Sequence, residues 1–347
     1  MKIALVAPLA ESVPPKLYGG TERVVSYLTE ELVRLGHDVT LFASGDSATA
    51  ARLVASCPHA LRLAAAADQI SPLSAMVERV RARAHEFDVV HFHIEPPLHL
   101  PLFRELAAKT VTTLHGRLDA PAVQALLREH PHMPLVSISN AQRAQAPGLN
   151  WLGTVHHGLS PEVCPFNPVP RGRFYAFLGR VSPEKGLDRA IALARGAGVE
   201  LRIAAKVDAA DERYFRERIT PLLGGPIQFV GELSEREKPE FLGNATGLLF
   251  TIDWPEPFGL AMIEALSCGT PVLGWRNGAV PEVIDDGVTG FVVDSMEAAA
   301  AQLPRLPTLD RSRVRRRFES RFLAPRMAQE YVAVYRALAR GGVRKVA

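Results

Sequence analysis

Short runs of apolar, β-branched residues alternate along the chain with longer segments whose apolar positions recur every three or four residues. Residues 3–7 form the first run, a helical stripe follows over residues 21–35, and a second strand-like run occupies residues 39–43. Thr21 is a candidate cap for this helix and Gly36 a candidate stop. Strands and helices in this order predict a parallel sheet with right-handed crossovers. Further strands of the first half are expected at residues 89–94, 110–114, 135–139 and 154–156.

The same alternation restarts after a proline-rich stretch that contains Pro165, Pro168 and Pro170. Such a stretch, with little apolar periodicity, is typical of a linker between compact units, and 347 residues suffice for two cores. We therefore expect an α/β protein with two Rossmann-like, doubly wound domains. The expected boundaries are 1–165 for the first domain, 166–322 for the second and 323–347 for a closing C-terminal helix. Strands of the second half are expected at residues 174–178, 201–205, 227–230, 247–252, 271–273 and 290–293.

Composition and charge exclude several classes of protein. With 47% hydrophobic and 22% charged residues the chain has an ordinary globular composition, and a net charge of +3, widely dispersed, argues against nucleic-acid binding. No apolar run approaches the roughly 20 residues that span a bilayer. The apolar start leads directly into a domain-like pattern, which favours a buried strand over a signal peptide. Cys57, Cys164 and Cys268 are far apart and form no ligand-type pairs, as expected for a reducing, cytoplasmic setting.

One segment near the C-terminus is locally basic. We favour a solvated helix face for it, and a peripheral contact with anionic lipid or another polyanion is the alternative. Its basic residues are Arg311, Arg313, Arg315, Arg316, Arg317 and Arg321.

The most informative chemistry lies in residues 256–264, where two carboxylates stand eight positions apart. Pro255 and Pro257 bracket Glu256, disfavour helix and hold its carboxylate on an extended loop. Glu264 falls inside the helix-prone run that follows, where it could accept hydrogen bonds from ribose hydroxyls. Taken singly, Glu256 could be a solvated loop residue and Glu264 an ordinary polar position on a helix.

Backbone amides cluster at the start of that helix, over Phe258, Gly259 and Leu260. A helix N-terminus carries unpaired N–H donors and a partial positive charge, so it suits a phosphate held without a metal.

A second constellation, Leu178-Gly179-Arg180-Val181-Ser182-Pro183-Glu184-Lys185-Gly186, follows the first strand of the second half. It brings Arg180 and Lys185 to the carboxyl end of the sheet. A diphosphate leaving group needs its growing charge neutralised, and a guanidinium and an ammonium can do so without a metal. The alternative is that both are plain surface charges.

The first half lacks the Gly-x-Gly-x-x-Gly fingerprint of dinucleotide-binding enzymes. Gly19 and Gly20 instead precede the first helix, either to let a ligand approach the backbone or simply to make a turn with positive φ. His115 ends a strand, where ligands of open α/β sheets bind, although a histidine satisfied in the core is an equal alternative.

A zinc site at four closely spaced residues of the first half is disfavoured, because alternate strand positions and a Pro-Pro turn build no tetrahedral cage. We prefer a role for these residues in lining or supporting the acceptor side. The residues concerned are His91, His93, Glu95 and His99.

With the stretch Cys268-Gly269-Thr270-Pro271-Val272, these motifs resemble the retaining glycosyltransferases of family four, also called glycosyl transferases group 1. The resemblance implies the GT-B fold, in which two Rossmann-like domains face each other across a cleft and the last helix crosses back to the first domain. It assigns Glu256 to the donor sugar, Glu264 to the ribose, and both Arg180 and Lys185 to the donor pyrophosphate.

In the first domain the resemblance assigns His115 to the sugar, and Gly19 and Gly20 to the loop that approaches the donor phosphate. It places Gly231 and Leu233 at the edge of the nucleobase. Lys206 stands where many relatives have a glycine, which departs from the family pattern for base and ribose contacts. Asn277, Gly278, Pro281 and Glu282 resemble the family's turn and short helix after the nucleotide-contacting strand.

The implied function is metal-independent, retaining transfer of a hexose from a nucleotide-diphosphate sugar to an acceptor hydroxyl, with no cofactor and no nucleic-acid partner. A UDP-sugar is the expected donor class, while the motifs leave the base, the sugar and the acceptor open: a polysaccharide, a lipid-linked molecule or a small molecule. A catalytically silent sugar-nucleotide-binding subunit and a nucleotide-sugar epimerase on the same fold are the alternatives.

Overall fold

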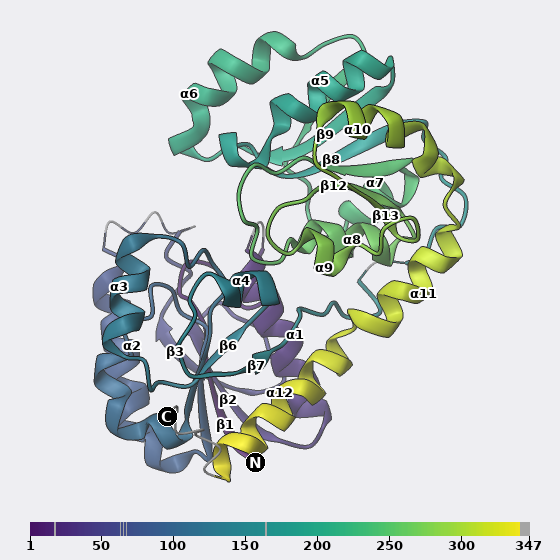
Figure 1. Ribbon diagram of the computed structural model, residues 1–347. Coiled ribbons are helices and arrows are strands. Elements are labelled where there is room, and N and C mark those ends of the chain that lie inside the picture. Colours follow the sequence, from purple (N-terminus) through teal and green to yellow (C-terminus); the bar gives the residue numbers. More distant parts are fainter. Residues whose placement is uncertain (17–18, 63, 65, 67, 164, 341–347) are drawn as a thin grey trace. The chain divides into compact units, whose positions relative to one another are not determined.

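The protein is described by a computed structural model that covers residues 1–16, 19–62, 64, 66, 68–163 and 165–340. The chain folds into two compact units (Figure 1). Unit 1 comprises Met1–Gly158 and Ala324–Ala347, and unit 2 comprises Leu159–Leu323. Each unit is built on a parallel sheet, so the α/β, doubly wound class expected from the sequence is confirmed.

Unit 1 contains a seven-stranded sheet in the order β3-β2-β1-β4-β5-β6-β7. The strand order reverses between β1 and β4, and this switch point is where open parallel sheets bind ligands, at the carboxyl ends of the strands. The strands are β1 Lys2–Val6, β2 Asp38–Ser44, β3 Arg52–Cys57, β4 Val89–Phe92, β5 Thr110–Thr113, β6 Leu135–Ser137 and β7 Trp151–Thr154. The main helices are α1 Gly20–Arg34, α2 Ile70–Arg83, α3 Pro121–Glu129, α4 Asn140–Ala144 and α12 Ala324–Ala339.

Helix α1 forms because its apolar residues fall on one stripe that can be buried against the sheet. Val24, Leu28 and Leu32 are fully buried, as the periodicity predicts. The proposed Thr21 cap is wrong, because Gly19 is the N-cap residue and the helix already begins at Gly20. Gly36, with φ of 80°, stops the helix as expected.

Two strands of unit 1 differ from the sequence-based expectation. Strand β3 was not expected; it pairs with β2 at the edge of the sheet, and its short apolar run of Leu53, Val54 and Ala55 is only partly buried. The strand expected at 154–156 is shifted, since β7 covers Trp151–Thr154 and pairs with β6 through Trp151. His156 and His157 therefore lie beyond the carboxyl end of β7.

Unit 2 contains a six-stranded parallel sheet in the order β10-β9-β8-β11-β12-β13, with its switch point between β8 and β11. Gly198, with φ of 65°, is the C-cap residue of helix α5, Leu187–Ala197. The strands are β8 Phe174–Arg180, β9 Glu200–Lys206, β10 Ile227–Gly231, β11 Gly247–Phe250, β12 Val272–Trp275 and β13 Gly290–Val293. The helices are α5 Leu187–Ala197, α6 Glu212–Tyr214, α7 Lys238–Asn244, α8 Leu260–Ser267, α9 Val280–Val283, α10 Met296–Gln302 and α11 Arg311–Arg321.

Helix α12, the last helix among the described residues, packs beside α1 in unit 1 (Figure 1). Its aromatic residues Tyr331 and Tyr335 are fully buried, and both hydroxyl groups contact polar side chains of the sheet. The helix is therefore anchored by apolar burial and by specific hydrogen bonds together.

The arginines of α11 are largely occupied within unit 2. Arg311 donates to the carbonyl groups of Asn167, Gly243 and Ala245, and burial lowers its pKa to about 10. Arg317 and Arg321 both pair with Asp285, at 2.5 and 2.7 Å. Arg315 pairs with Glu319, and Arg316 lies 3.7 Å from Asp310. Most of the basic stretch thus holds unit 2 together.

Across the described residues, no helix is both long enough and apolar enough to cross a membrane. Cys57 and Cys268 are free thiols, whereas Cys164 lies outside the described residues.

Candidate active site

The sequence-predicted cations of unit 2 lie at the carboxyl edge of its sheet, at the switch point. Arg180 is the last residue of β8, and Lys185 ends the short 3-10 turn Pro183–Lys185 that follows. Gly186 then takes a left-handed conformation with φ of 65°, and a Cβ atom there would lie 2.0 Å from the carbonyl oxygen of Thr251. Only glycine lets the loop after β8 lie this close to the end of β11.

Lys185 and Glu256 form the central contact of the site. The Lys185 Nζ lies 2.6 Å from Glu256 Oε2, and the two side chains are only 15% and 10% exposed. The ammonium also lies 4.7 Å from the centre of the Trp254 ring, a cation–π distance. Gly278 supports Glu256 from behind, because a Cβ atom at Gly278 would lie 2.2 Å from the Glu256 carbonyl oxygen. The structure thus brings together two residues separated by 71 positions in the sequence.

Arg180 belongs to a second charged group beside this pair. Its Nη2 donates to Glu184 Oε1 at 2.8 Å, and its Nη1 lies 3.7 Å from Asp208 Oδ2. Lys206 Nζ lies 2.8 Å from the other oxygen of Asp208. Burial alone would raise the pKa of Glu184. Hydrogen bonds and the nearby Arg180 guanidinium outweigh this effect and lower the pKa, so the carboxylate is ionised at neutral pH.

The residues Phe258, Gly259 and Leu260 lie at the start of α8. Gly259 is its N-cap residue, with φ of 85°. Leu260 is the first residue of the helix. The Phe258 ring is buried against Phe322, with centroids 6.1 Å apart, so only the backbone of Phe258 is available to a ligand.

Glu264 lies inside α8 and is 4% exposed. Lys238 Nζ lies 3.3 Å from Glu264 Oε1 and 2.6 Å from Glu235 Oε1. Sequence reasoning did not select Lys238, because a lysine in a charged segment such as Glu235–Lys238 gives no signal of its partner in a distant helix.

Gly231 and Leu233 lie at the far side of this edge. Gly231 ends β10 with φ of 85° at a register shift in the pairing with β9, and half-buried Leu233 follows in the loop. Strand β10 is separated from β8 by β9, so Gly231 and Leu233 do not adjoin the Lys185–Glu256 pair, which lies at the ends of β8 and β11.

In unit 1, His115 follows β5 at the carboxyl edge of the sheet. Its Nε2 lies 2.9 Å from His93 Nδ1, and its ring stacks on that of His157 at 5.3 Å. Burial lowers the pKa of His115 to about 3, so the imidazole is neutral at neutral pH. Among the described residues, His115 Nδ1 has no hydrogen-bond partner.

Glu95 holds the backbone around His115. Its Oε1 accepts from the amides of His115, at 2.5 Å, and Gly116, at 2.8 Å. Much of Glu95 is exposed, but its carboxylate is desolvated against this backbone. Desolvation raises the pKa of Glu95, and the two amide hydrogen bonds partly oppose the rise.

The remaining histidines of the β4 segment support the sheet from its interior. His91 bonds Tyr335 and Thr113 through its two ring nitrogens, both at 2.8 Å. His99 stacks on Phe92, on the other face of β4. These side chains therefore do not converge, and no group of three or more His, Cys, Asp or Glu in the part of the chain that is described could hold a metal ion.

The glycines before α1 do not make a positive-φ turn at Gly19, whose φ is −172°. Glycine is required there for space, because a Cβ atom would lie 2.7 Å from Pro15 Cβ. Gly20 is the first residue of α1. The adjoining Leu17 and Tyr18 lie outside the described residues.

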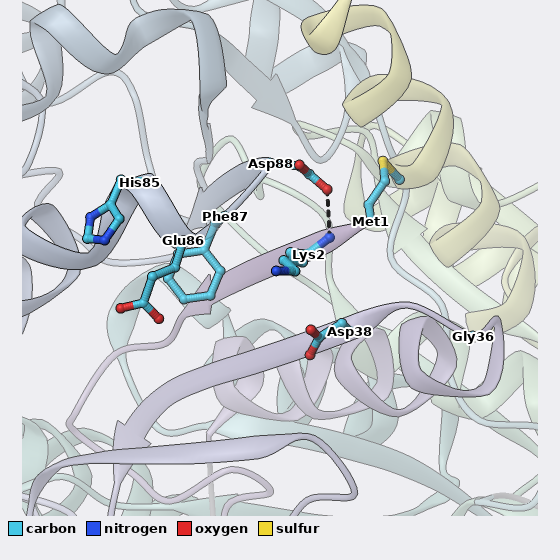
Figure 2. A pocket seen from close by; sticks show the side chains of 8 residues that line it. All are labelled: Met1, Lys2, Gly36, Asp38, His85, Glu86, Phe87 and Asp88. Atoms are coloured by element: carbon cyan, nitrogen blue, oxygen red, sulfur yellow. Dashed lines mark hydrogen bonds between the residues drawn. The ribbon is translucent and has the colours of Figure 1, made fainter.

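A surface pocket of unit 1 lies at the opposite, amino edge of the sheet (Figure 2). Its dashed contact joins the Lys2 amide to Asp88 at 2.8 Å. Because β1, β2 and β4 begin at this edge, the pocket is separate from the edge that carries His115. Its lining residues are Met1, Lys2, Gly36, Asp38, His85, Glu86, Phe87 and Asp88.

Two doubly wound parallel sheets, together with the similarity to solved glycosyltransferase structures, define an α/β protein of the GT-B class. The chain belongs to glycosyltransferase family 4, whose family model matches residues 18–210, while the model for glycosyl transferases group 1 matches residues 166–320. The resemblance deduced from the motifs is thereby confirmed, and with it the assignment to a transferase enzyme class.

Several known proteins resemble the chain over different lengths. A GDP-mannose-dependent alpha-(1-6)-phosphatidylinositol dimannoside mannosyltransferase of Mycobacterium tuberculosis is 34% identical over 68% of this chain and 70% of the relative. The D-inositol 3-phosphate glycosyltransferase of Mycolicibacterium smegmatis is 31% identical over 46% of this chain, and the match spans only 39% of that relative. The crystal structure of AviGT4, a glycosyltransferase involved in avilamycin A biosynthesis, superposes with a TM-score of 0.75 at 25% identity, covering 98% of both chains.

Proposed function

We propose that the chain is a metal-independent, retaining glycosyltransferase that moves a hexose from a nucleotide-diphosphate sugar to an acceptor hydroxyl. The observation that carries the proposal is the buried Lys185–Glu256 pair at 2.6 Å, next to the N-terminus of α8. It sets an ammonium for a diphosphate beside a carboxylate for sugar hydroxyls, at the switch point of the sheet.

In the proposed reaction the bond between the anomeric carbon and the diphosphate oxygen breaks, and a bond from that carbon to the acceptor oxygen forms on the same face. The acceptor proton passes to the departing diphosphate, so no side chain acts as nucleophile. Arg180, Lys185 and the amides at Gly259 and Leu260 stabilise the leaving group, while Glu256 orients the sugar. Glu264 holds the ribose, in an orientation supported by Lys238.

The neutral imidazole of His115 suits a different task. A sugar hydroxyl is uncharged, and the Nδ1 atom, which has no partner among the described residues, can exchange one hydrogen bond with it. Gly19 and Gly20, before α1, are assigned to the loop that approaches the donor phosphate. Gly231 and Leu233 are assigned to the edge of the nucleobase.

The donor is best sought among GDP-mannose, which is named for the M. tuberculosis relative, and UDP-sugars. The first experiment measures binding and slow hydrolysis of UDP-, GDP- and ADP-sugars in the presence of a chelator, followed by transfer to inositol phosphates and phosphatidylinositol-type lipids. We expect the Lys185→Ala variant to lose about 100-fold or more in turnover, since Lys185 supports charge that develops in the transition state. Arg213→Ala, in an 82% exposed side chain paired with Glu217, is the matched control and should behave as wild type.

Wild-type rates in Lys185→Ala would overturn the site assignment, and loss of activity with the chelator would overturn the metal-independent mechanism. An inverted anomeric centre in the product, determined by NMR, would contradict retention. Binding of nucleotide sugar with neither hydrolysis nor transfer would instead indicate a silent binding subunit, and donor conversion without an acceptor would indicate an epimerase.

A further inference from the structure

Lys206 lies beside the proposed diphosphate site, although the family pattern gave it no role there. It is the last residue of β9, and the pairing of β8 with β9 sets it directly opposite Arg180, the last residue of β8. The amide of Val181 donates to the Lys206 carbonyl at 2.8 Å, which extends this pairing past the strand ends. Both long cationic side chains therefore start from the same carboxyl edge, on neighbouring strands.

Asp208 holds these two cations with its two oxygens. Oδ1 lies 2.8 Å from Lys206 Nζ, and Oδ2 lies 3.7 Å from an Arg180 guanidinium nitrogen. A guanidinium and an ammonium arranged around the two oxygens of one anion is also the arrangement that binds a phosphoryl group. The Asp208 carboxylate thus has the charge and the oxygen pair of a phosphate in the same place.

The balance of charge at this edge of the sheet also indicates that a bound diphosphate would replace a carboxylate. Each of its three cations has a carboxylate partner: Glu184 and Asp208 for Arg180, Asp208 for Lys206, and Glu256 for Lys185. An incoming diphosphate adds negative charge to a group that is already balanced. It can be accommodated when one carboxylate gives up its cations, and Asp208, whose side chain is 30% exposed, precedes the short 3-10 helix Ala209–Asp211 at the edge of the sheet.

We propose that Lys206 is a third cationic ligand of the donor diphosphate, and that Asp208 is an internal counterion which the diphosphate replaces. This inference rests on the proposed function, because it concerns the same nucleotide site. Lys206 is then a residue that determines specificity for diphosphates, and the lysine in place of the common glycine adds a charge contact that glycine-bearing relatives lack.

The proposal gives opposite signs for two neighbouring substitutions. Lys206→Ala should weaken the affinity for GDP or UDP about tenfold, as expected for the loss of one charge-assisted contact at a partly exposed site. Asp208→Asn should strengthen it roughly two- to fivefold, because a competing counterion is removed. Lys206→Arg should restore most of the affinity lost in Lys206→Ala.

The measurement is isothermal titration calorimetry with GDP and UDP, and with guanosine and uridine as probes that lack phosphate. Nucleoside affinities should be unchanged in all three variants, which separates a phosphate contact from a general loss of structure. Arg202→Ala, a paired arginine on the same strand β9, is the matched control and should leave every affinity unchanged.

Unaltered diphosphate affinity in Lys206→Ala, with the loss confined to Arg180→Ala and Lys185→Ala, would overturn this inference and leave the proposed function intact. Weaker rather than stronger diphosphate binding in Asp208→Asn would overturn it as well. Failure of the wild-type protein to bind any nucleoside diphosphate would instead overturn the proposed function.

Discussion

The two units bring opposite kinds of chemistry to the carboxyl edges of similar sheets. All eleven histidines of the chain fall between residues 37 and 157, within unit 1, and unit 2 has none. Around His115 the polar groups are buried, neutral imidazoles that contact one another. Around Lys185 they are ion pairs between basic side chains and carboxylates.

This difference follows from what each edge has to contact in the proposed reaction. A diphosphate demands fixed positive charge, and carboxylate partners keep such cations in position. Sugar and acceptor hydroxyls are neutral, and a buried imidazole offers them a donor or an acceptor without the cost of desolvating a charge. One sheet architecture thus presents two polarities, and the side chains at the strand ends decide which.

The largest effect expected from the comparison is a selective loss of stability of unit 1 in acid. Burial lowers the pKa of His99 to about 3, and those of His91 and His93 fall well below the ordinary range. The unfolded chain therefore binds more protons than the folded one between about pH 6.5 and pH 3. Stability is complete above this window and falls as the pH falls through it, by about 2 kcal/mol at pH 5 for a group like His99.

Hydrogen exchange at pH 7 and pH 5, corrected for intrinsic rates, should show protection lost in unit 1 and retained in unit 2. His99→Gln, which can keep the hydrogen bond to Thr112, should remove about 2 kcal/mol of the difference between the two pH values. His59→Gln, at an exposed position, is the control and should not alter it. Equal acid sensitivity of the two units would show that the neutral histidine cluster is not what separates them.

A second prediction compares one glycine from each unit. Gly186 and Gly36 both have positive φ, of 65° and 80°, but a Cβ atom at Gly186 would meet the Thr251 carbonyl oxygen at 2.0 Å, whereas none of the described atoms lies within 4 Å at Gly36. Gly36→Ala should cost only the backbone term of about 1 kcal/mol. Gly186→Ala should cost about 3 kcal/mol, because the clash adds to that strain.

Urea denaturation of both variants tests this difference, and nucleotide binding tests its consequence. Because the clash displaces the turn that carries Lys185, Gly186→Ala should also lose diphosphate affinity, which Gly36→Ala should retain. Similar stability in the two variants would mean that the loop after β8 does not depend on close contact with β11.

Local sequence signals were sufficient for the parts of the molecule with strong patterns. The strand–helix alternation predicted both parallel sheets, and the prolines around Glu256 placed its carboxylate on a loop before α8. Strand β3 was not predicted, because it lies at the edge of the sheet and its apolar run, Leu53 to Ala55, is short and only partly buried.

Pairings across long separations could not be predicted in the same way. No spacing rule links Lys238 to Glu264, or Asp208 to both Arg180 and Lys206, since these contacts arise only when neighbouring strands and helices are assembled. His91, His93 and His99 were candidates to line or support the acceptor side, and all three side chains are fully buried within unit 1.

The smallest expected effect concerns the hydrogen bonds that join α12 to the buried polar side chains of the sheet. Tyr335→Phe removes the partner of His91 Nδ1 and leaves a buried ring nitrogen without a hydrogen bond, at a cost of about 1–2 kcal/mol. Tyr331→Phe removes only the 3.0 Å contact to Thr113, whose hydroxyl keeps its hydrogen bond to His91, so the cost should be about 0.5 kcal/mol. Urea denaturation at pH 7 would measure the difference. An equal loss of stability in both variants would mean that packing, rather than the hydrogen bond between Tyr335 and His91, anchors the helix.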